Sequence, residues 1–132
     1  LTVTGKDLKK VGWKAHCGNI PASYLTGLIC GREAKKHKIT EAVADLGLHV
    51  STHGSRVYAA LKGVIDGGLK VPCSEDILPD EKRLSGKHVE EYATKLKSEK
   101  PQDYSKQFSK YVKDNVKDIS KHFDEIKKKI LK

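Results

Sequence analysis

Residues 51–56 have the residue types and spacing that best suit contact with an anion. Thr52, Ser55 and Arg56 can each hydrogen-bond a phosphate group, and they lie around Gly54 where a helical pattern begins. Backbone N–H groups at a helix start also attract negative charge. A hydroxyl group at this place could equally be the N-cap of the helix, and the two roles can coexist. The candidate anion contacts are Thr52, His53, Gly54, Ser55 and Arg56, with Lys62 further along the same predicted helix.

A second predicted helix start follows Gly18. Asn19 is placed to cap this helix, and Pro21 falls in the first turn, where a helix tolerates it. In a parallel sheet both helix starts lie at the carboxyl edge of the strands, where ligands usually bind, so the sequence predicts that the two starts are grouped. Trp13 could stack on a base, although a lone tryptophan is more often a packing residue. The candidate contacts here are Lys9, Lys10, Trp13, Lys14, Asn19 and Ser23.

Catalytic chemistry finds little support in the sequence. His53 lies near Ser51, Ser55 and Asp45, but their spacing matches no known triad, and there is no G-x-S-x-G motif. No segment ends in the Gly-Lys-Ser/Thr of a phosphate-binding loop, and no G-x-G-x-x-G follows a strand. The sequence therefore predicts a protein that is not an enzyme and uses no cofactor.

The cysteines do not form a metal-binding pattern. Cys17, Cys30 and Cys73 are far apart and include no C-x-x-C pair, which indicates reduced thiols in a reducing compartment. A metal cluster of His16, Cys17 and Cys73 is conceivable but lacks a ligand pair with zinc-type spacing. We predict no metal site.

Alternating strand and helix patterns predict the elements that position these residues. Residues 1–4, 41–47 and 69–71 are typical of strands, and the first is followed by a lysine-bearing loop as far as Trp13. Between the strands, the helical stripes are Tyr24, Leu25, Leu28 and Ile29 in the first helix, and Val57, Ala60, Leu61, Val64 and Ile65 in the second. This order predicts an α/β fold with parallel strands joined by right-handed crossovers.

Ser23, Gly27 and Gly31 recur every four residues along one face of the first predicted helix. Small residues at this spacing let a helix lie close on its neighbour, here expected to be the sheet. The flanking charges exclude the membrane-dimer interpretation of the same motif. Gly27 and Gly31 are therefore predicted to be packing residues.

The composition divides the chain at about residue 80. Residues 1–80 carry eleven basic and eight acidic residues, and residues 81–132 carry fifteen and nine. The first part holds ten of the eleven glycines, whereas the second is lysine-rich and has three helical stripes. We predict an α/β core at residues 1–80 and a helical C-terminal extension at residues 81–132.

The net charge of +9 favours a polyanionic partner such as nucleic acid. Only Arg32, Arg56 and Arg83 are arginines, and these are the sharper candidates because arginine can form paired bonds to a phosphate. No apolar run approaches the roughly 20 residues of a membrane helix, and no signal peptide is visible. We expect a soluble, cytoplasmic protein. The lack of methionine and the strand-like opening predict that sequence is missing upstream.

Five segments together resemble one family. They are GNIPASYLTGL at residues 18–28, DLGL at 45–48, GSRVYAALKG at 54–63, VIDGGLKVP at 64–72, and KQFSKYVKDNV at 106–116. Their order and spacing are similar to large-subunit ribosomal protein eighteen in its archaeal and eukaryotic form. The last segment resembles the C-terminal helical extension of the eukaryotic members.

The resemblance implies a mixed sheet flanked by helices and a structural role in the central protuberance of the large ribosomal subunit. The implied partners are 5S ribosomal RNA, the large-subunit ribosomal RNA and neighbouring ribosomal proteins, with no membrane and no small-molecule substrate. Family members carry a basic N-terminal arm and further strands before the position of Leu1. Eukaryotic relatives often have a histidine at the position of Cys73, to which we assign no role.

Two other classes of function remain open at this point. A doubly wound domain that binds a nucleotide or a phosphorylated metabolite would use the same two helix starts, but it lacks a base, a nucleophile and a ribose-reading acid. A protein-interaction module would use the lysine-rich helices instead. Co-purifying RNA, a bound nucleotide or a retained protein partner would distinguish the three.

Overall fold

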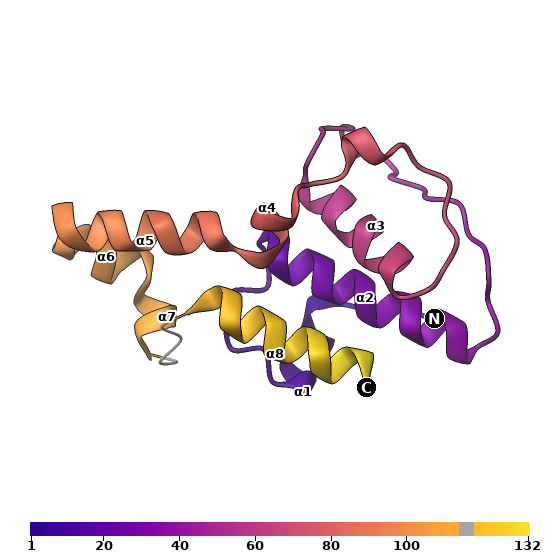
Figure 1. Ribbon diagram of the computed structural model, residues 1–132, viewed down its shortest axis with the longest axis horizontal. Helices are drawn as coiled ribbons and strands as arrows, with labels where there is room; N and C mark the ends of the chain where they lie inside the picture. The colour runs from indigo at the N-terminus through magenta and orange to yellow at the C-terminus, as the bar shows by residue number, and fades with distance from the viewer. Residues whose placement is uncertain (114–117) are drawn as a thin grey trace.

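The computed structural model describes residues 1–113 and 118–132, and its regular structure there is helical apart from one isolated bridge. Figure 1 shows α1, α2, α3 and α8 in one body, from which α5 and α6 extend as an arm. The elements are α1 (Gly5–Val11), α2 (Ile20–Lys36), α3 (Arg56–Asp66), the short 3₁₀ helix η1 (Glu75–Ile77), α4 (Glu81–Ser85), α5 (Lys87–Glu99), α6 (Pro101–Gln107), α7 (Ser109–Lys113) and α8 (Ile119–Leu131).

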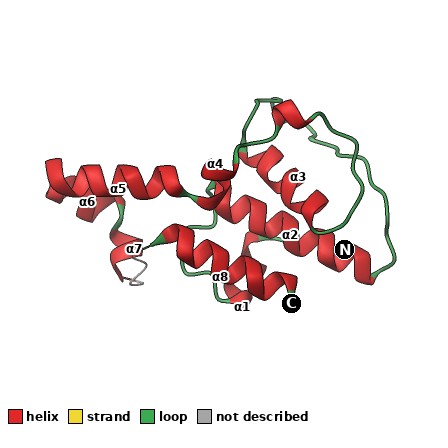
Figure 2. Cartoon of the chain, in the orientation of Figure 1, coloured by secondary structure: helices red, strands yellow, loops and turns green. Residues whose placement is uncertain are grey.

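The predicted α/β fold with a mixed sheet is wrong for the described residues. A single parallel bridge joins Glu41 to Lys70, with backbone bonds of 3.0 Å from Ala42 N–H to the Lys70 carbonyl and from Lys70 N–H to the Thr40 carbonyl. Figure 2 accordingly draws these segments as loops. The doubly wound alternative needs the same parallel sheet, so it loses its structural basis as well.

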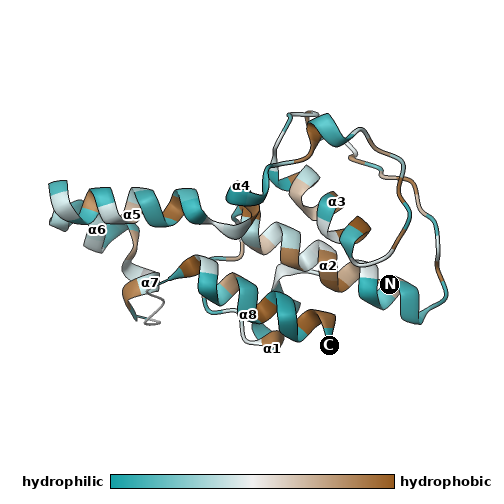
Figure 3. Ribbon diagram, viewed as in Figure 1, coloured by the Kyte–Doolittle hydropathy of each residue, from teal (hydrophilic) through white to brown (hydrophobic). Residues whose placement is uncertain are grey.

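The reason lies in what covers the predicted strands. Val43 of the strand predicted at residues 41–47 is 84% exposed, and just after that strand Leu48 is fully exposed and Val50 84% exposed. Parallel sheets are stable when both faces are buried, and two short strands alone are marginal in water. Figure 3 shows hydrophobic stretches along this outer loop, where no described element packs over them. The apolar run alone therefore does not suffice to form a sheet.

The N-terminal segment also differs from the prediction. Residues 1–4 form no strand, and part of the predicted loop before Trp13 is helix α1. Thr4 is the N-cap of α1, with extended backbone angles, and Gly12 ends the helix in the left-handed conformation at φ +105°. A capping pattern thus begins a helix directly after the segment whose apolar residues suggested a strand.

Helices α2 and α3 form where the periodicity places them, and they pack directly on one another. A Cβ atom on Gly27 would lie 2.8 Å from the carbonyl carbon of Ala60, and one on Gly63 would lie 2.8 Å from the Leu28 nitrogen. The contacts advance together along both helices, from Gly27 and Ala60 to Gly31 and Val64, so the helices run parallel. The predicted packing role of Gly27 and Gly31 is confirmed, but their partner is α3 and not a sheet.

Helix α8 completes the hydrophobic core. Its Ile119, Phe123 and Ile126 are buried and belong to the same cluster as Leu8 of α1 and Leu25 of α2. The core thus joins side chains from both sides of residue 80, and the two-domain division stays a prediction.

The arm made by α5 and α6 carries few buried side chains. Lys100 caps the end of α5, and Pro101 is the first residue of α6. Phe108 is buried between Tyr104 and Tyr111, with ring centroids 5.3 and 5.7 Å away. The end of the family-like segment at residues 106–116 lies outside the described residues. None of the described helices has the length and apolar character needed to cross a membrane.

Candidate nucleic-acid interface

The starts of α2 and α3 lie together and are joined by Arg56. One guanidinium nitrogen of Arg56 donates to the Gly18 carbonyl at 3.0 Å, and Gly18 directly precedes the N-cap of α2. Because the helices run parallel, both first turns face the same end of the body (Figure 1). The predicted grouping of the two helix starts therefore exists, but helix packing produces it in place of a sheet edge.

The two helix starts are capped differently. In α2 the Asn19 side chain accepts from the Ala22 N–H at 3.0 Å. In α3 the corresponding residue is Ser55, whose side chain makes no capping bond and whose buried hydroxyl has no partner among the described residues. The first turn of α3 thus keeps N–H groups that no side-chain cap satisfies. This places donor groups next to the exposed Arg56 side chain.

Residues 51–54 form an exposed turn in front of α3. Thr52 and His53 are exposed, and Gly54 has a left-handed φ of +66° while its N–H donates to the Ile77 carbonyl at 2.9 Å. The Ser51 hydroxyl is hydrogen-bonded to the Tyr58 hydroxyl. The backbone is therefore held by internal bonds, and the side chains of Thr52 and His53 face solvent.

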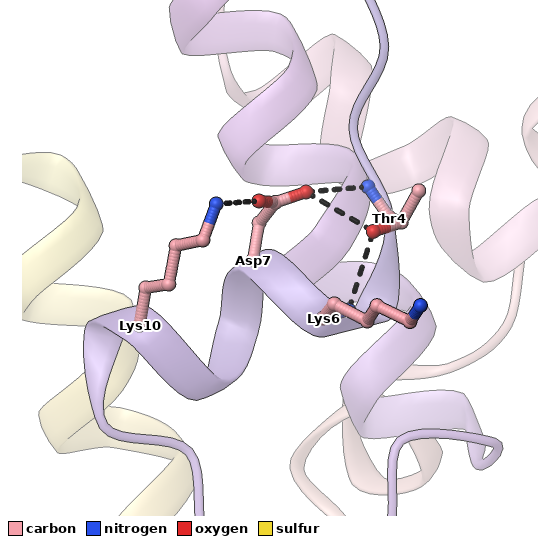
Figure 4. A network of polar contacts seen from close by, with 4 residues as sticks. All are labelled: Thr4, Lys6, Asp7 and Lys10. Carbon is pink, nitrogen blue, oxygen red and sulfur yellow. Dashed lines mark hydrogen bonds and ion pairs between the residues drawn. The ribbon is translucent and has the colours of Figure 1, made fainter.

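Helix α1 presents the lysines on the other side of Gly18. A capping box begins this helix: Thr4 Oγ1 accepts from the Lys6 N–H at 3.3 Å, and the Thr4 N–H donates to Asp7 at 2.9 Å (Figure 4). Lys10 also donates to Asp7 at 2.8 Å. The bonds from Lys10 and then Thr4 lower the pKa of Asp7 to about 2. Lys9 is exposed and forms no ion pair within residues 1–113 and 118–132.

Trp13 is only 3% exposed, and its ring is stacked on His122 of α8 with centroids 5.0 Å apart. Its Nε1–H donates to the His16 carbonyl at 3.3 Å, and the N–H of the exposed Lys14 donates to His122 Nε2 at 3.1 Å. Burial is the main cause that lowers the pKa of His122. This placement favours the packing interpretation of Trp13, whereas Lys14 lies exposed at the surface.

The other candidates have structural partners. Asn19 donates to the Tyr111 hydroxyl at 3.3 Å, and Ser23 Oγ donates to the Asn19 carbonyl at 3.0 Å. Lys62 is paired with Asp66 at 3.2 Å, and Asp66 also accepts from a buried tyrosine. Contacts of these three side chains with nucleic acid stay predictions.

Two basic residues near Gly18 were not among the predicted RNA contacts. Lys6 lies in the first turn of α1, and His16 accepts the Gly18 N–H through Nδ1 at 2.9 Å. The capping pattern Thr4-x-x-Asp7 was the available signal, since it marks a helix start that places Lys6 and Lys9 near each other. The prediction of a strand at residues 1–4 hid that signal.

In the described ranges no three histidine, cysteine or acidic side chains are grouped as metal ligands would be, and the three cysteines are free. Exposed cationic groups and backbone donors at the joined helix starts are suited to contact with an anion.

Comparison with known proteins identifies the family. A family model described as "Ribosomal large subunit proteins 60S L5, and 50S L18" matches residues 33–74. Large ribosomal subunit protein uL18 of Methanococcus maripaludis is 49% identical over 133 residues, which cover 99% of this chain and 68% of that protein. The chain therefore belongs to the uL18 family of large-subunit ribosomal proteins, as its sequence resemblance predicted, and is a structural component of the ribosome and not an enzyme.

Proposed function

We propose that this protein binds 5S ribosomal RNA and helps to attach it to the large ribosomal RNA in the central protuberance. Family membership supports the coarser part of this statement: a ribosomal role in translation, in the cytoplasm, with ribosomal RNA and ribosomal proteins as partners. The choice of 5S RNA and of the central protuberance rests on the sequence resemblance described above.

The observation that carries the proposal is the bond between Arg56 and the Gly18 carbonyl. It joins two helix starts into one surface, which we call the helix-start surface and define as His16, Gly18, Thr52, His53 and Arg56, all exposed. Arg56 uses one donor for Gly18 and keeps others for a ligand, since a guanidinium has five N–H groups. A phosphate placed there would meet Arg56 and the first turn of α3 together.

The lysines of α1 extend this surface without adding sequence-reading groups. Ammonium groups bind phosphates as point charges, so they strengthen binding to any RNA and displace condensed counterions. Selectivity for 5S RNA must then come from the shape of the RNA and from forked contacts such as those available to Arg56.

A filter-binding series tests the proposal. The affinity for 5S RNA is compared with that for an unrelated RNA of equal length, between about 50 and 200 mM salt. We expect tighter binding of 5S RNA and a steep loss of affinity as salt rises. Equal affinities for the two RNAs would contradict the choice of 5S RNA, and a flat salt profile would contradict phosphate contacts.

A further inference from the structure

A surface pocket of about 320 Å³ lies between the start of α1 and the loop before α2. Thr4, Gly5, Lys6 and Lys9 line it from α1 and its cap, and His16, Cys17 and Gly18 line it from the loop. Gly18 belongs to the helix-start surface as well, so the pocket directly adjoins Arg56. None of its residues has a role in the hydrophobic core beyond the partial packing of Cys17.

The ionisable side chains of the lining, apart from the Cys17 thiol, are all basic. The lining contains Lys6, Lys9 and the imidazole of His16, and no carboxylate. Three other surface pockets of the described chain mix both signs: Lys62 with Asp66, Lys97 with Glu90, and Lys70 with Glu41. A pocket whose charged lining residues are the cations Lys6 and Lys9, with no carboxylate among them, concentrates anions.

The one carboxylate of α1 lies beside the pocket, bonded to the lining residue Thr4, and is not itself part of the lining. Asp7 is the acidic residue of α1, and its oxygens accept from Thr4 and Lys10. Lys6 and Lys9 take part in no ion pair with any described residue. Their ammonium groups are therefore available to a ligand, whereas that of Lys10 is engaged.

The shape of the pocket depends on its two glycines. A Cβ atom on Gly5 would lie 3.3 Å from the Cys17 Cβ, and one on Gly18 would lie 2.7 Å from the His16 ring. Glycine at both positions lets the loop close against α1. Because His16 Nδ1 accepts the Gly18 N–H, a neutral imidazole carries its proton on Nε2 and can donate it to a ligand.

We propose that this pocket binds a phosphate group of the RNA backbone, with Lys6 and Lys9 supplying the charge and His16 a hydrogen bond. The proposal rests on the function proposed above, because it takes the ligand from the same RNA that contacts Arg56. A polynucleotide suits the position better than a free anion, since consecutive phosphates can occupy the pocket and the Arg56 site together.

The test compares two double variants with the same change of charge. Lys6→Ala with Lys9→Ala removes the cations of the pocket, and Lys128→Ala with Lys132→Ala removes two exposed lysines of the C-terminal region. We expect the first pair to weaken RNA binding about tenfold, the value of one charge-assisted hydrogen bond, and to lower the salt slope by about one. The control pair should change the RNA affinity and the salt slope much less. Equal losses of RNA affinity in the two double variants would overturn the proposed phosphate site.

Inorganic phosphate and polyglutamate distinguish the sources of the anion. Weak binding of phosphate, measured by phosphorus NMR, should disappear in the Lys6 and Lys9 variant and in His16→Ala. Loss of phosphate binding with unchanged RNA binding would overturn the assignment to RNA, and so would competition by polyglutamate as strong as that by RNA.

The same measurements separate this proposal from the function on which it rests. If the unaltered protein does not prefer 5S RNA, the proposed function fails, and the phosphate titration still tests the pocket. If the preference exists and the Lys6 and Lys9 variant keeps full affinity, the pocket fails alone. Thermal melting of each variant checks that it is folded.

Discussion

Gly31 of α2 and Gly67, which follows α3, face each other so closely that a Cβ atom on either would crowd the other. Such an atom on Gly31 would lie 3.0 Å from the Gly67 Cα, and one on Gly67 would lie 2.9 Å from the Gly31 Cα. Gly27 and Gly63 make similar contacts with backbone atoms one turn earlier. The two helices thus touch through their backbones, and the helix-start surface depends on this contact for its geometry.

Gly27→Leu should destabilise the protein clearly. Overpacking typically costs about 1–3 kcal/mol, and here the obstacle is the Ala60 backbone, which cannot rotate away as a side chain can. Helix propensity acts in the opposite direction by about 0.5–1 kcal/mol, so the sign of the change in melting temperature decides which effect dominates. RNA affinity should fall only in proportion to the unfolded fraction.

Lys35→Leu serves as the control for this substitution, since it adds leucine to an exposed position near the end of the same helix. Its stability should change by no more than about 0.5 kcal/mol. A Gly27→Leu variant that melts higher and loses RNA affinity would mean that this face of α2 contacts RNA.

Tyr24→Phe should cost about 0.5–1.5 kcal/mol of unfolding free energy, and more if the charge of its acceptor strengthens the bond. Tyr24 is 1% exposed and donates to Asp66 at 2.7 Å. Burial and the neighbouring Asp66 raise the pKa of Tyr24, which agrees with a hydroxyl that stays protonated. Tyr92→Phe is the control, because its bond to Gln107 is 3.5 Å long and the residue is half-exposed. Urea denaturation that finds equal stabilities for the two variants would contradict the role of the Asp66 bond.

Stability should fall through His122 as the pH drops below the ordinary histidine pKa of 6.5. Burial lowers its folded-state pKa below the ordinary value of 6.5, so the unfolded chain binds the proton more readily. The contribution is therefore complete above pH 6.5 and is lost as the pH falls through the lowered pKa. Nearby Lys14 and Lys129 act in the same direction and Glu125 opposes them. Asp7 titrates far below this range.

The check is thermal melting of His122→Phe, which keeps an aromatic ring against Trp13 but does not titrate. Its melting temperature should depend less on pH than that of the unaltered protein. Some dependence should remain, because burial lowers the pKa of His88 as well. His49→Asn, at an exposed position, is the control substitution. Parallel profiles for His122→Phe and the unaltered protein would exclude His122 as the source.

Arg56→Ala should weaken 5S RNA binding about tenfold, because it removes a forked cation and the bond that joins the helix starts. Lys128→Ala is the control at an exposed position of α8. It is preferable to Lys127, whose ammonium group lies 5.1 Å from the ring centre of Tyr24 and so contributes to packing. The RNA affinity of Arg56→Lys should lie between those of Arg56→Ala and Lys128→Ala, since lysine keeps the charge but cannot form two parallel bonds to one group. Filter binding that gives equal losses for Arg56→Ala and Lys128→Ala would contradict the helix-start surface.

Ile126→Ala should destabilise the whole body, including residues before position 80. Ile126 is 1% exposed in the shared core, and truncation of such a residue costs about 2–5 kcal/mol. Urea denaturation followed by the fluorescence of Trp13, the one tryptophan, reports on the N-terminal side of that core. Leu131→Ala, at a more exposed position, is the control. An unchanged Trp13 transition in Ile126→Ala would favour two independent domains.

The helices could be predicted because their evidence is local. The apolar stripe before Gly31, the asparagine cap at Asn19 and the glycines after α3 act within a few residues of each other. The strands could not, because residues 41–47 form a sheet only if other segments pair with and cover them. Pairing and covering a strand depend on parts of the chain that are distant in sequence. No such cover forms over Val43, which remains exposed.

In the candidate site, too, some features could be predicted from the sequence and others could not. The grouping of the two helix starts was predicted correctly, although for the wrong reason. A parallel sheet would bring both helix starts to one edge, and two helices packed in parallel also bring their starts to one end. Lys6 was not among the predicted contacts because the strand expected at residues 1–4 left the capping pattern of α1 unused. His16 was not among them because a turn at Gly18, which no periodicity signals, brings it to the pocket. Whether each residue touches RNA stays a prediction.

The backbone contact between α2 and α3 has a consequence for the order of folding. Glycines offer no side chain that could begin an attraction at a distance, so the contact contributes energy only after residues 37–55 have closed and the helices have aligned. Interactions that form after the rate-limiting step slow unfolding and leave the folding rate almost unchanged. The glycine faces should therefore determine the lifetime of the native state more than the speed at which it is reached.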